Sequence, residues 1–138
     1  MPAYNEAIRF AGDVAFDEIR IISSNGFGQD VTNQVVAIEL YEDLWSPFMS
    51  GVLALKDSLD LTNLFPFVGE EFVNIKIHTP SFEGKDKTIN DQFYIYKMTN
   101  RIAKGDRSVI YELHFISREA IVDLNKATSK AYAGKCSD

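Results

Sequence analysis

The stretch that decides the fold of this 138-residue chain is SPFMSGVLALKDSLDLTNLFPFVGEEFVNIKIHT, residues 46–79. It contains two apolar segments separated by a polar link with acidic ends. In the second segment Val73, Ile75 and Ile77 alternate with polar residues, which is the two-residue period of a strand with one buried face. Two strands joined through an acidic corner predict the wall of a β-barrel, and no part of the stretch has the pattern of a catalytic centre.

Similar patterns continue on both sides of this stretch. The dipeptide Asn25-Gly26 predicts a hairpin turn, and residues 80–91, rich in polar and turn-forming residues, predict an exposed loop. In the segment 31–41, Val36, Ile38 and Leu40 are expected to share one face. The predicted strands are residues 16–23, 31–41, 48–56, 72–79, 93–102 and 108–116.

The apolar period changes from two residues to three or four at Ser117, which is a typical residue to precede a helix. We therefore predict a helix over residues 117–132 that ends before Gly134. The expected fold class is mainly β: a small barrel or sandwich of six or seven strands with the C-terminal helix packed on it. Residues 1–15 are expected to form an arm and residues 16–138 one domain, which we take to be the first domain of a longer protein.

Composition narrows the function classes. The chain has 14 basic and 20 acidic residues and a formal charge of −6, which argues against nucleic-acid binding through phosphate neutralisation. Cys136 is the single cysteine, so an intrachain disulfide framework is excluded. The first residues lack a signal-peptide pattern, and no apolar run reaches the roughly 20 residues of a membrane span. We expect assembly in the cytoplasm.

The candidates for chemistry are few. His78 and His114 are the only histidines, both on the polar side of predicted strands, and their spacing is not that of a zinc site. Glu112 shares a face with His114, but a solvated polar face is the more economical interpretation. Cys136 has nothing nearby in the sequence to activate it as a nucleophile. We therefore expect no enzyme activity, no metal and no cofactor.

Acidic residues gather at both ends of the central link, at Asp57, Asp60, Glu70 and Glu71. They lack the alternating oxygen ligands of a calcium loop, which favours a solvated edge or a subunit contact. Five aromatic residues lie near the link: Trp45, Phe48, Phe65, Phe67 and Phe72. Most of them are expected in the core, and a surplus exposed at an edge would mark a subunit interface. The residues predicted to lie at an interface are Asp57, Glu70, Glu71, Lys85, Asp86 and Lys87.

Three short motifs carry a resemblance to a known family. They are GxLxLxDS at residues 51–58, GEE at 69–71 and VxIxI at 73–77. In this order they resemble the tube domain of baseplate hub proteins from contractile (T4-like) phage tails. The strands at 93–98 and 110–117 and the helix that follows are similar to the next elements of that domain. The resemblance covers residues 31–138 and does not extend to residues 1–30.

The resemblance implies a structural virion protein, the hub that initiates the tail tube. Such a barrel forms a ring that seats the central spike on one side and begins the tail tube on the other, with baseplate wedge proteins as further neighbours. The ring would be a trimer if a second tube-like domain follows, and a hexamer of single barrels, as in a tail-tube protein, if none does. DNA would pass through the lumen without specific binding, since an acidic wall repels it.

Two other functions stay open on the sequence alone. One is a glycan-binding or glycan-hydrolysing module of the tail tip, which would need an aromatic platform such as Trp45 beside paired carboxylates in a concave site. The other is a β-barrel adaptor without a phage role. The three hypotheses differ in assembly state and in the shape of the site.

Overall fold

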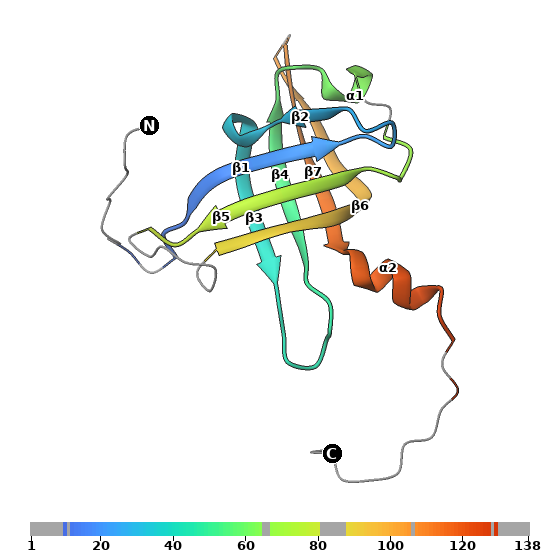
Figure 1. The fold of residues 1–138 in the computed structure, drawn as a ribbon. Helices are drawn as coiled ribbons and strands as arrows, with labels where there is room; N and C mark the ends of the chain where they lie inside the picture. The colour runs from blue at the N-terminus through green and yellow to red at the C-terminus, as the bar shows by residue number, and fades with distance from the viewer. Residues whose placement is uncertain are drawn as a thin grey trace.

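The computed structural model describes residues 10, 12–64, 67–80, 88–105, 107–127 and 129. Its strands are β1 (Ala15–Ile22), β2 (Gly28–Asp30), β3 (Val35–Tyr41), β4 (Ser50–Asp57), β5 (Phe72–His78), β6 (Thr88–Lys104) and β7 (Ser108–Ser117). The helical segments are η1 (Thr32–Gln34), α1 (Leu61–Leu64) and α2 (Arg118–Leu124). All strand pairs are antiparallel, in the order β2-β1-β5-β6-β7-β4-β3, and the sheet curls into a half-barrel (Figure 1). The predicted mainly β fold is confirmed.

The core lies on the concave face of this sheet, and the alternation in the sequence selects its residues. Val73 and Ile75 of β5 and Tyr111, Leu113 and Phe115 of β7 are all fully buried. Burying one such side chain contributes about 1.5–3 kcal/mol, so a strand shifted by one residue would lose several of these contributions at once. This cost holds the strands in register.

The predicted second strand over residues 31–41 is wrong in its first part. Val31 is buried, and its N–H donates to the carbonyl of Ile19 at 2.8 Å. The N–H of Ile19 in turn donates to the hydroxyl of Thr32 at 2.8 Å. These bonds lie at the start of η1, which contacts both β1 and β4 and so bridges the two halves of the curled sheet.

The side-chain order within β3 also differs from the prediction. A bulge between Val35 and Ala37 leaves Val36 without a partner in β4, and its side chain is exposed. Ile38 and Leu40 pack against the core as expected. The extra residue of a bulge changes which side chains face inward, and the sequence has no glycine here to signal it.

The exposed loop predicted over residues 80–91 is too long. Thr88–Lys104 form β6, in which Ile89 pairs with Ile77 and packs against the core. Residues 81–87 lie outside the described part of the chain. The backbone hydrogen bonds to β5 and the burial of Ile89 outweigh the polar composition of its neighbours.

The predicted helix over residues 117–132 is shorter in the structure. α2 ends at Leu124, where Asn125 turns its side-chain amide back to donate to the carbonyl of Ile121 at 3.0 Å. Ala120 is buried against the sheet, but Leu124 is 82% exposed. The apolar stripe therefore loses its partner surface after two turns, and Gly134 lies outside the described residues.

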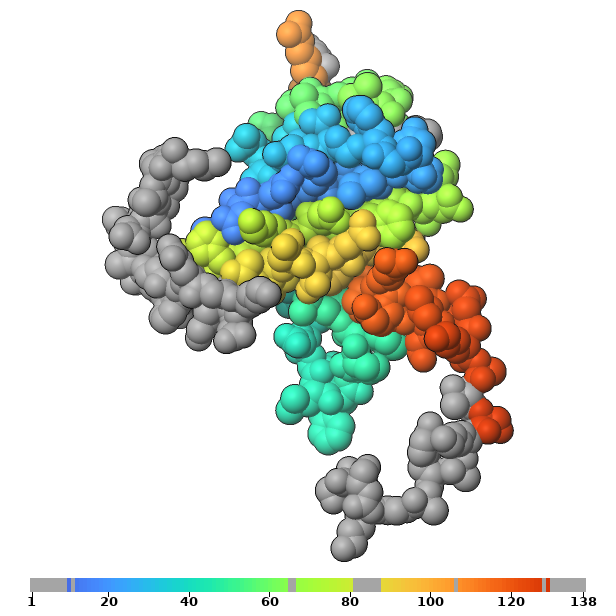
Figure 2. All heavy atoms as spheres, viewed as in Figure 1, coloured from blue at the N-terminus to red at the C-terminus, as the bar shows by residue number. Residues whose placement is uncertain are grey.

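The hairpin between β3 and β4 extends beyond the body of the sheet. In Figure 2 its atoms project from one end of the molecule, and α2 lies beside it. The hydrogen bond from the N–H of Ser117 to the carbonyl of Met49, at 2.8 Å, ties the start of α2 to the end of this hairpin. The two elements form the candidate interaction surface.

Candidate interaction surface

Asp57 lies at the end of β4 with a side chain that is turned inward. The residue is 3% exposed. One carboxylate oxygen accepts from the N–H of Leu59 at 2.9 Å, and the other accepts from the N–H of Leu61 at 2.8 Å and the hydroxyl of Tyr111 at 3.1 Å. The carboxylate thus anchors α1 to β7, as buried charges do when their lone pairs are satisfied.

Tyr111 shows the electrostatic effect of this arrangement. Burial raises the pKa of its phenol far above the ordinary value of 10, and the nearby Asp57 carboxylate raises it further. The hydroxyl therefore keeps its proton and donates it in the hydrogen bond. The pair is a structural contact inside the fold.

Glu71 is buried in a similar way. It is 1% exposed, and its two carboxylate oxygens accept from the N–H groups of Val68 and Gly69 at 2.7 and 2.9 Å. Gly69 has a φ of +94°, a conformation that glycine adopts at little cost. Glu71 thus closes the turn before β5 with its own side chain, whereas its neighbour Glu70 is exposed.

Of the predicted interface residues, the structure therefore describes three. The side chains of Asp57 and Glu71 are used inside the chain, so a partner would contact the turns they hold and not their carboxylates. Glu70 is open to solvent. Lys85, Asp86 and Lys87 lie outside the described residues, and the interface prediction for this whole set stays a prediction.

The two histidines lie apart. The Nδ1 atom of His78 is 2.8 Å from the carboxylate of Asp17, joining β5 to β1. His114 points away from the core, where its Nε2 lies 2.8 Å from the hydroxyl of Thr99. Glu112 also bonds to this hydroxyl, at 3.3 Å, so His114 and Glu112 share Thr99 between them.

Neither arrangement resembles a metal centre. No group of three or more potential metal ligands occurs in the part of the chain that the structure describes. Cys136 lies outside that part. Among the described helices, none has the length and apolar character required to cross a membrane.

Among the described residues, the hairpin between β3 and β4 carries the most exposed apolar side chains. Leu44 is 100% exposed and Trp45 is 94% exposed. The carboxylate of Asp43 accepts from the N–H of Trp45 at 2.6 Å and from that of Ser46 at 2.7 Å, which holds the turn in shape. The sequence left open which of the aromatic residues near the link would be the exposed surplus. The acidic neighbours of Trp45, Glu42 and Asp43, were the available sign that it follows the tip of a hairpin.

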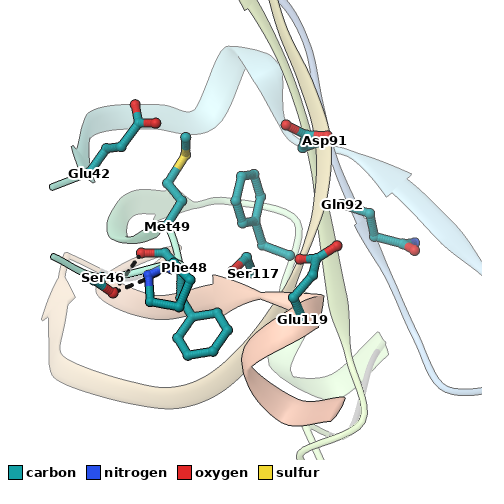
Figure 3. A pocket seen from close by; sticks show the side chains of 10 residues that line it. Glu42, Ser46, Phe48, Met49, Asp91, Gln92, Ser117 and Glu119 are labelled. Carbon is teal, nitrogen blue, oxygen red and sulfur yellow. Dashed lines mark hydrogen bonds between the residues drawn. The ribbon is translucent and has the colours of Figure 1, made fainter. Parts of the chain in front are cut away.

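A pocket of about 270 Å³ opens at the base of this hairpin (Figure 3). Its apolar surface comes from Pro47, Phe48, Met49 and Phe93, and its carboxylates come from Glu42, Asp91 and Glu119. A second hollow shares Pro47, Phe48 and Glu119 with it and continues along α2 to Val122 and Lys126. Together they form one groove between the hairpin and α2, which we call the hairpin–helix groove.

The sequence did not indicate this groove. Its residues come mainly from the hairpin between β3 and β4, from β6, from the end of β7 and from α2, and only the fold brings them together. Trp45 does not line either hollow among the described residues, so the aromatic platform expected of a glycan site is not formed by it. Comparison of the sequence with protein-family models and with curated proteins finds no match.

Proposed function

We propose that this chain is a structural virion protein, the hub or hub-like component that initiates the tail tube of a contractile phage tail. The chain would form a ring between the central spike and the tail tube, in a baseplate assembled in the host cytoplasm. The proposal joins the resemblance of residues 31–138 to baseplate hub proteins with the architecture of the sheet.

The observation that carries the proposal is the open curled sheet. Among the described residues the sheet begins at β2 and ends at β3, and neither strand has a partner on its outer side. An unpaired edge is a template for pairing with another chain. β3 is seven residues long and contains one charged residue, Glu39, so this edge suits a neighbouring subunit better than solvent.

The exposed apolar residues support the same role. Val36 and Tyr41 on β3 are 60% and 53% exposed, and Leu44 and Trp45 extend this apolar character into the hairpin. Apolar side chains gathered along one edge strand and the hairpin that follows it are characteristic of protein–protein contacts. The formal charge of −6 is compatible with a channel through which DNA slides without binding.

Light scattering coupled to gel filtration, followed by electron microscopy, tests the proposal. We expect rings of three or six subunits for the protein alone or mixed with its spike and tube neighbours. Three subunits favour a hub, and six favour a tail-tube protein. A monomer that forms no ring with these neighbours would contradict the proposal, and retention of that monomer on immobilised glycan would favour a glycan-binding module.

A matched pair of variants tests the edge itself. Val36→Lys places a charge on the edge strand β3 and should abolish ring formation, because desolvating a lysine at a strand interface is unfavourable. Ile102→Lys is the control, since Ile102 is 57% exposed but lies on β6, which β7 and β4 separate from the β3 edge. Equal assembly of both variants would show that the β3 edge is not the contact.

A further inference from the structure

The charged residues that line the first pocket of the hairpin–helix groove are all of one sign. Every ionisable residue that lines it is acidic: Glu42 directly after β3, Asp91 on β6 and Glu119 on α2. Within the described ranges, none of the three takes part in an ion pair or a side-chain hydrogen bond. Three unpaired carboxylates around one hollow make a site with a strong preference for a cation.

The floor of the pocket is apolar and firmly held. Phe93 is 2% exposed and packs on Phe115 with ring centres 5.0 Å apart. Ser46 fixes the backbone of Phe48 through two bonds, of 3.2 and 3.3 Å, drawn in Figure 3. A ligand would therefore meet a preformed surface, which lowers the entropic cost of binding.

One polar atom in the wall of the pocket is unsatisfied. The hydroxyl oxygen of Ser117 is buried and has no hydrogen-bond partner in the described structure. Buried hydroxyls nearly always have a partner. In Figure 3 Ser117 lies between Met49 and Glu119. A small movement of this wall would let a hydrogen-bond donor of a bound ligand reach the hydroxyl oxygen of Ser117.

We propose that this pocket binds a lysine or arginine side chain from an extended segment of a partner protein. The aliphatic part of such a side chain would cover Met49 and Phe93, while its charged end would reach the carboxylates. Long cationic side chains have this combination of an apolar stem and a polar head. A volume of about 270 Å³ is below the usual range for small-molecule sites, about 300–1,000 Å³, and suits one side chain.

The second hollow of the groove has the character needed for a neighbouring apolar residue of the same segment. It is lined by the apolar residues Pro47, Phe48 and Val122 and by the charged residues Arg118, Glu119, Asp123 and Lys126. The acidic part and the apolar part lie side by side, because both hollows share Phe48 and Glu119. A segment in which one basic residue is flanked by apolar residues would match both.

Nuclear magnetic resonance titration of the ¹⁵N-labelled protein tests the inference. The probe is the peptide acetyl-Gly-Leu-Arg-Leu-Gly-amide, and the control peptide carries citrulline, which has the shape of arginine without its charge. We expect a dissociation constant on the order of 1 mM, with shifts concentrated at the amides of Met49, Ser117 and Glu119. The citrulline peptide should bind at least about tenfold more weakly, because three carboxylates each lose a partner.

Variants locate the effect. Each of Glu42→Gln, Asp91→Asn and Glu119→Gln should weaken arginine-peptide binding about threefold, and the triple variant tenfold or more. Glu70→Gln, an exposed acid outside the groove, is the control and should change nothing. The mutated positions are exposed, so the variants should retain the native spectrum, which the same experiment verifies.

Several results would overturn the inference: equal binding of the two peptides, an unchanged affinity of the triple variant, or shifts centred on Leu44 and Trp45. A neutral oligosaccharide that shifts the same amides more strongly than the arginine peptide would overturn it as well. The inference rests on the proposed assembly role only in expecting a protein partner. Ring formation is measured separately with Val36→Lys, so either idea can fail without the other.

Discussion

The Asp57–Tyr111 contact allows a sharp test of what holds this fold together. Replacing Asp57 by alanine removes the acceptor of three hydrogen bonds and leaves two buried donors, the N–H of Leu61 and the hydroxyl of Tyr111, without a partner. A buried donor left unsatisfied costs about 1–3 kcal/mol. We therefore expect Asp57→Ala to lower the free energy of unfolding by about 4 kcal/mol, a large part of the 5–15 kcal/mol of a typical domain.

Tyr111→Phe should cost much less. The Asp57 oxygen that accepts from Tyr111 also accepts from the N–H of Leu61, so it keeps a partner when the hydroxyl is removed. A loss of about 1–1.5 kcal/mol is expected. In the double variant the hydroxyl is no longer present to be left unsatisfied, so the two losses should fall short of additivity by about 1–2 kcal/mol.

Urea unfolding followed by far-ultraviolet circular dichroism measures these differences. Fluorescence of Trp45 is a poor probe, because this residue is 94% exposed in the folded state. With a slope of about 2 kcal/mol per molar urea, Asp57→Ala should lower the midpoint by about 2 M. Asp123→Ala, at an exposed position on α2, is the control and should change the free energy by less than about 0.5 kcal/mol.

The result that would refute this reasoning is strict additivity of the Asp57 and Tyr111 substitutions. So would a loss for Asp57→Ala no larger than that of the exposed control. Either outcome would mean that the carboxylate is solvated in the native state and that α1 is held to β7 by other contacts.

Three further substitutions should have measurable effects. Glu71→Gln puts an amide donor against the turn N–H groups that the carboxylate now accepts, so urea unfolding should show a loss of about 2 kcal/mol, against almost none for Glu70→Gln. Gly51→Ala should lower the free energy of unfolding by about 3 kcal/mol in the same assay. The added methyl would overlap a backbone carbonyl of β3 and lie 2.5 Å from a core phenyl ring. A stable Gly51→Ala variant would show that β3 and β4 can separate. Hydrogen bonds from Thr32 lower the pKa of Asp30 below its ordinary 3.8, so this carboxylate stabilises the fold above that pH and its contribution is lost as the pH falls through the lowered value. In Thr32→Val, nuclear magnetic resonance titration should find the pKa of Asp30 raised toward 3.8, and an unchanged pKa would contradict the role of Thr32.

The fold class could be predicted because it depends on local sequence patterns, which are the same whatever the order of the strands in the sheet. Alternation in residues 72–79 and 108–116 sorts the side chains of β5 and β7 onto two faces, since successive residues of a strand point to opposite sides. The buried residues of both strands are those that the alternation selected. The Asn25-Gly26 turn is confirmed for the same reason: the signal is local, and β1 and β2 pair directly across it.

The candidate site could not be predicted in this way. From the sequence, Asp57 and Glu71 were expected to be solvent-exposed acidic residues at the ends of a link, but the fold buries both. Their carboxylates accept hydrogen bonds from backbone N–H groups of the adjacent turns and, for Asp57, from the phenol of Tyr111 on β7. The sequence did not indicate which of the aromatic residues near the link would be exposed, and the structure exposes Trp45. Hydrophobicity alone does not say which apolar side chains the core has room to bury.

By itself, the sequence determined that this chain folds as antiparallel strands followed by a helix, and it determined which side of β5 and of β7 faces inward. The tertiary structure alone decided that β1 pairs with β5 and that β3 forms the outer edge beside β4. It also decided that three carboxylates with no partner among the described residues surround one apolar pocket. The physical reason is the range of the interactions. Strand faces and turns depend on neighbours along the chain, whereas strand order and pockets depend on contacts between residues far apart in sequence, which only the packing of the whole sheet selects.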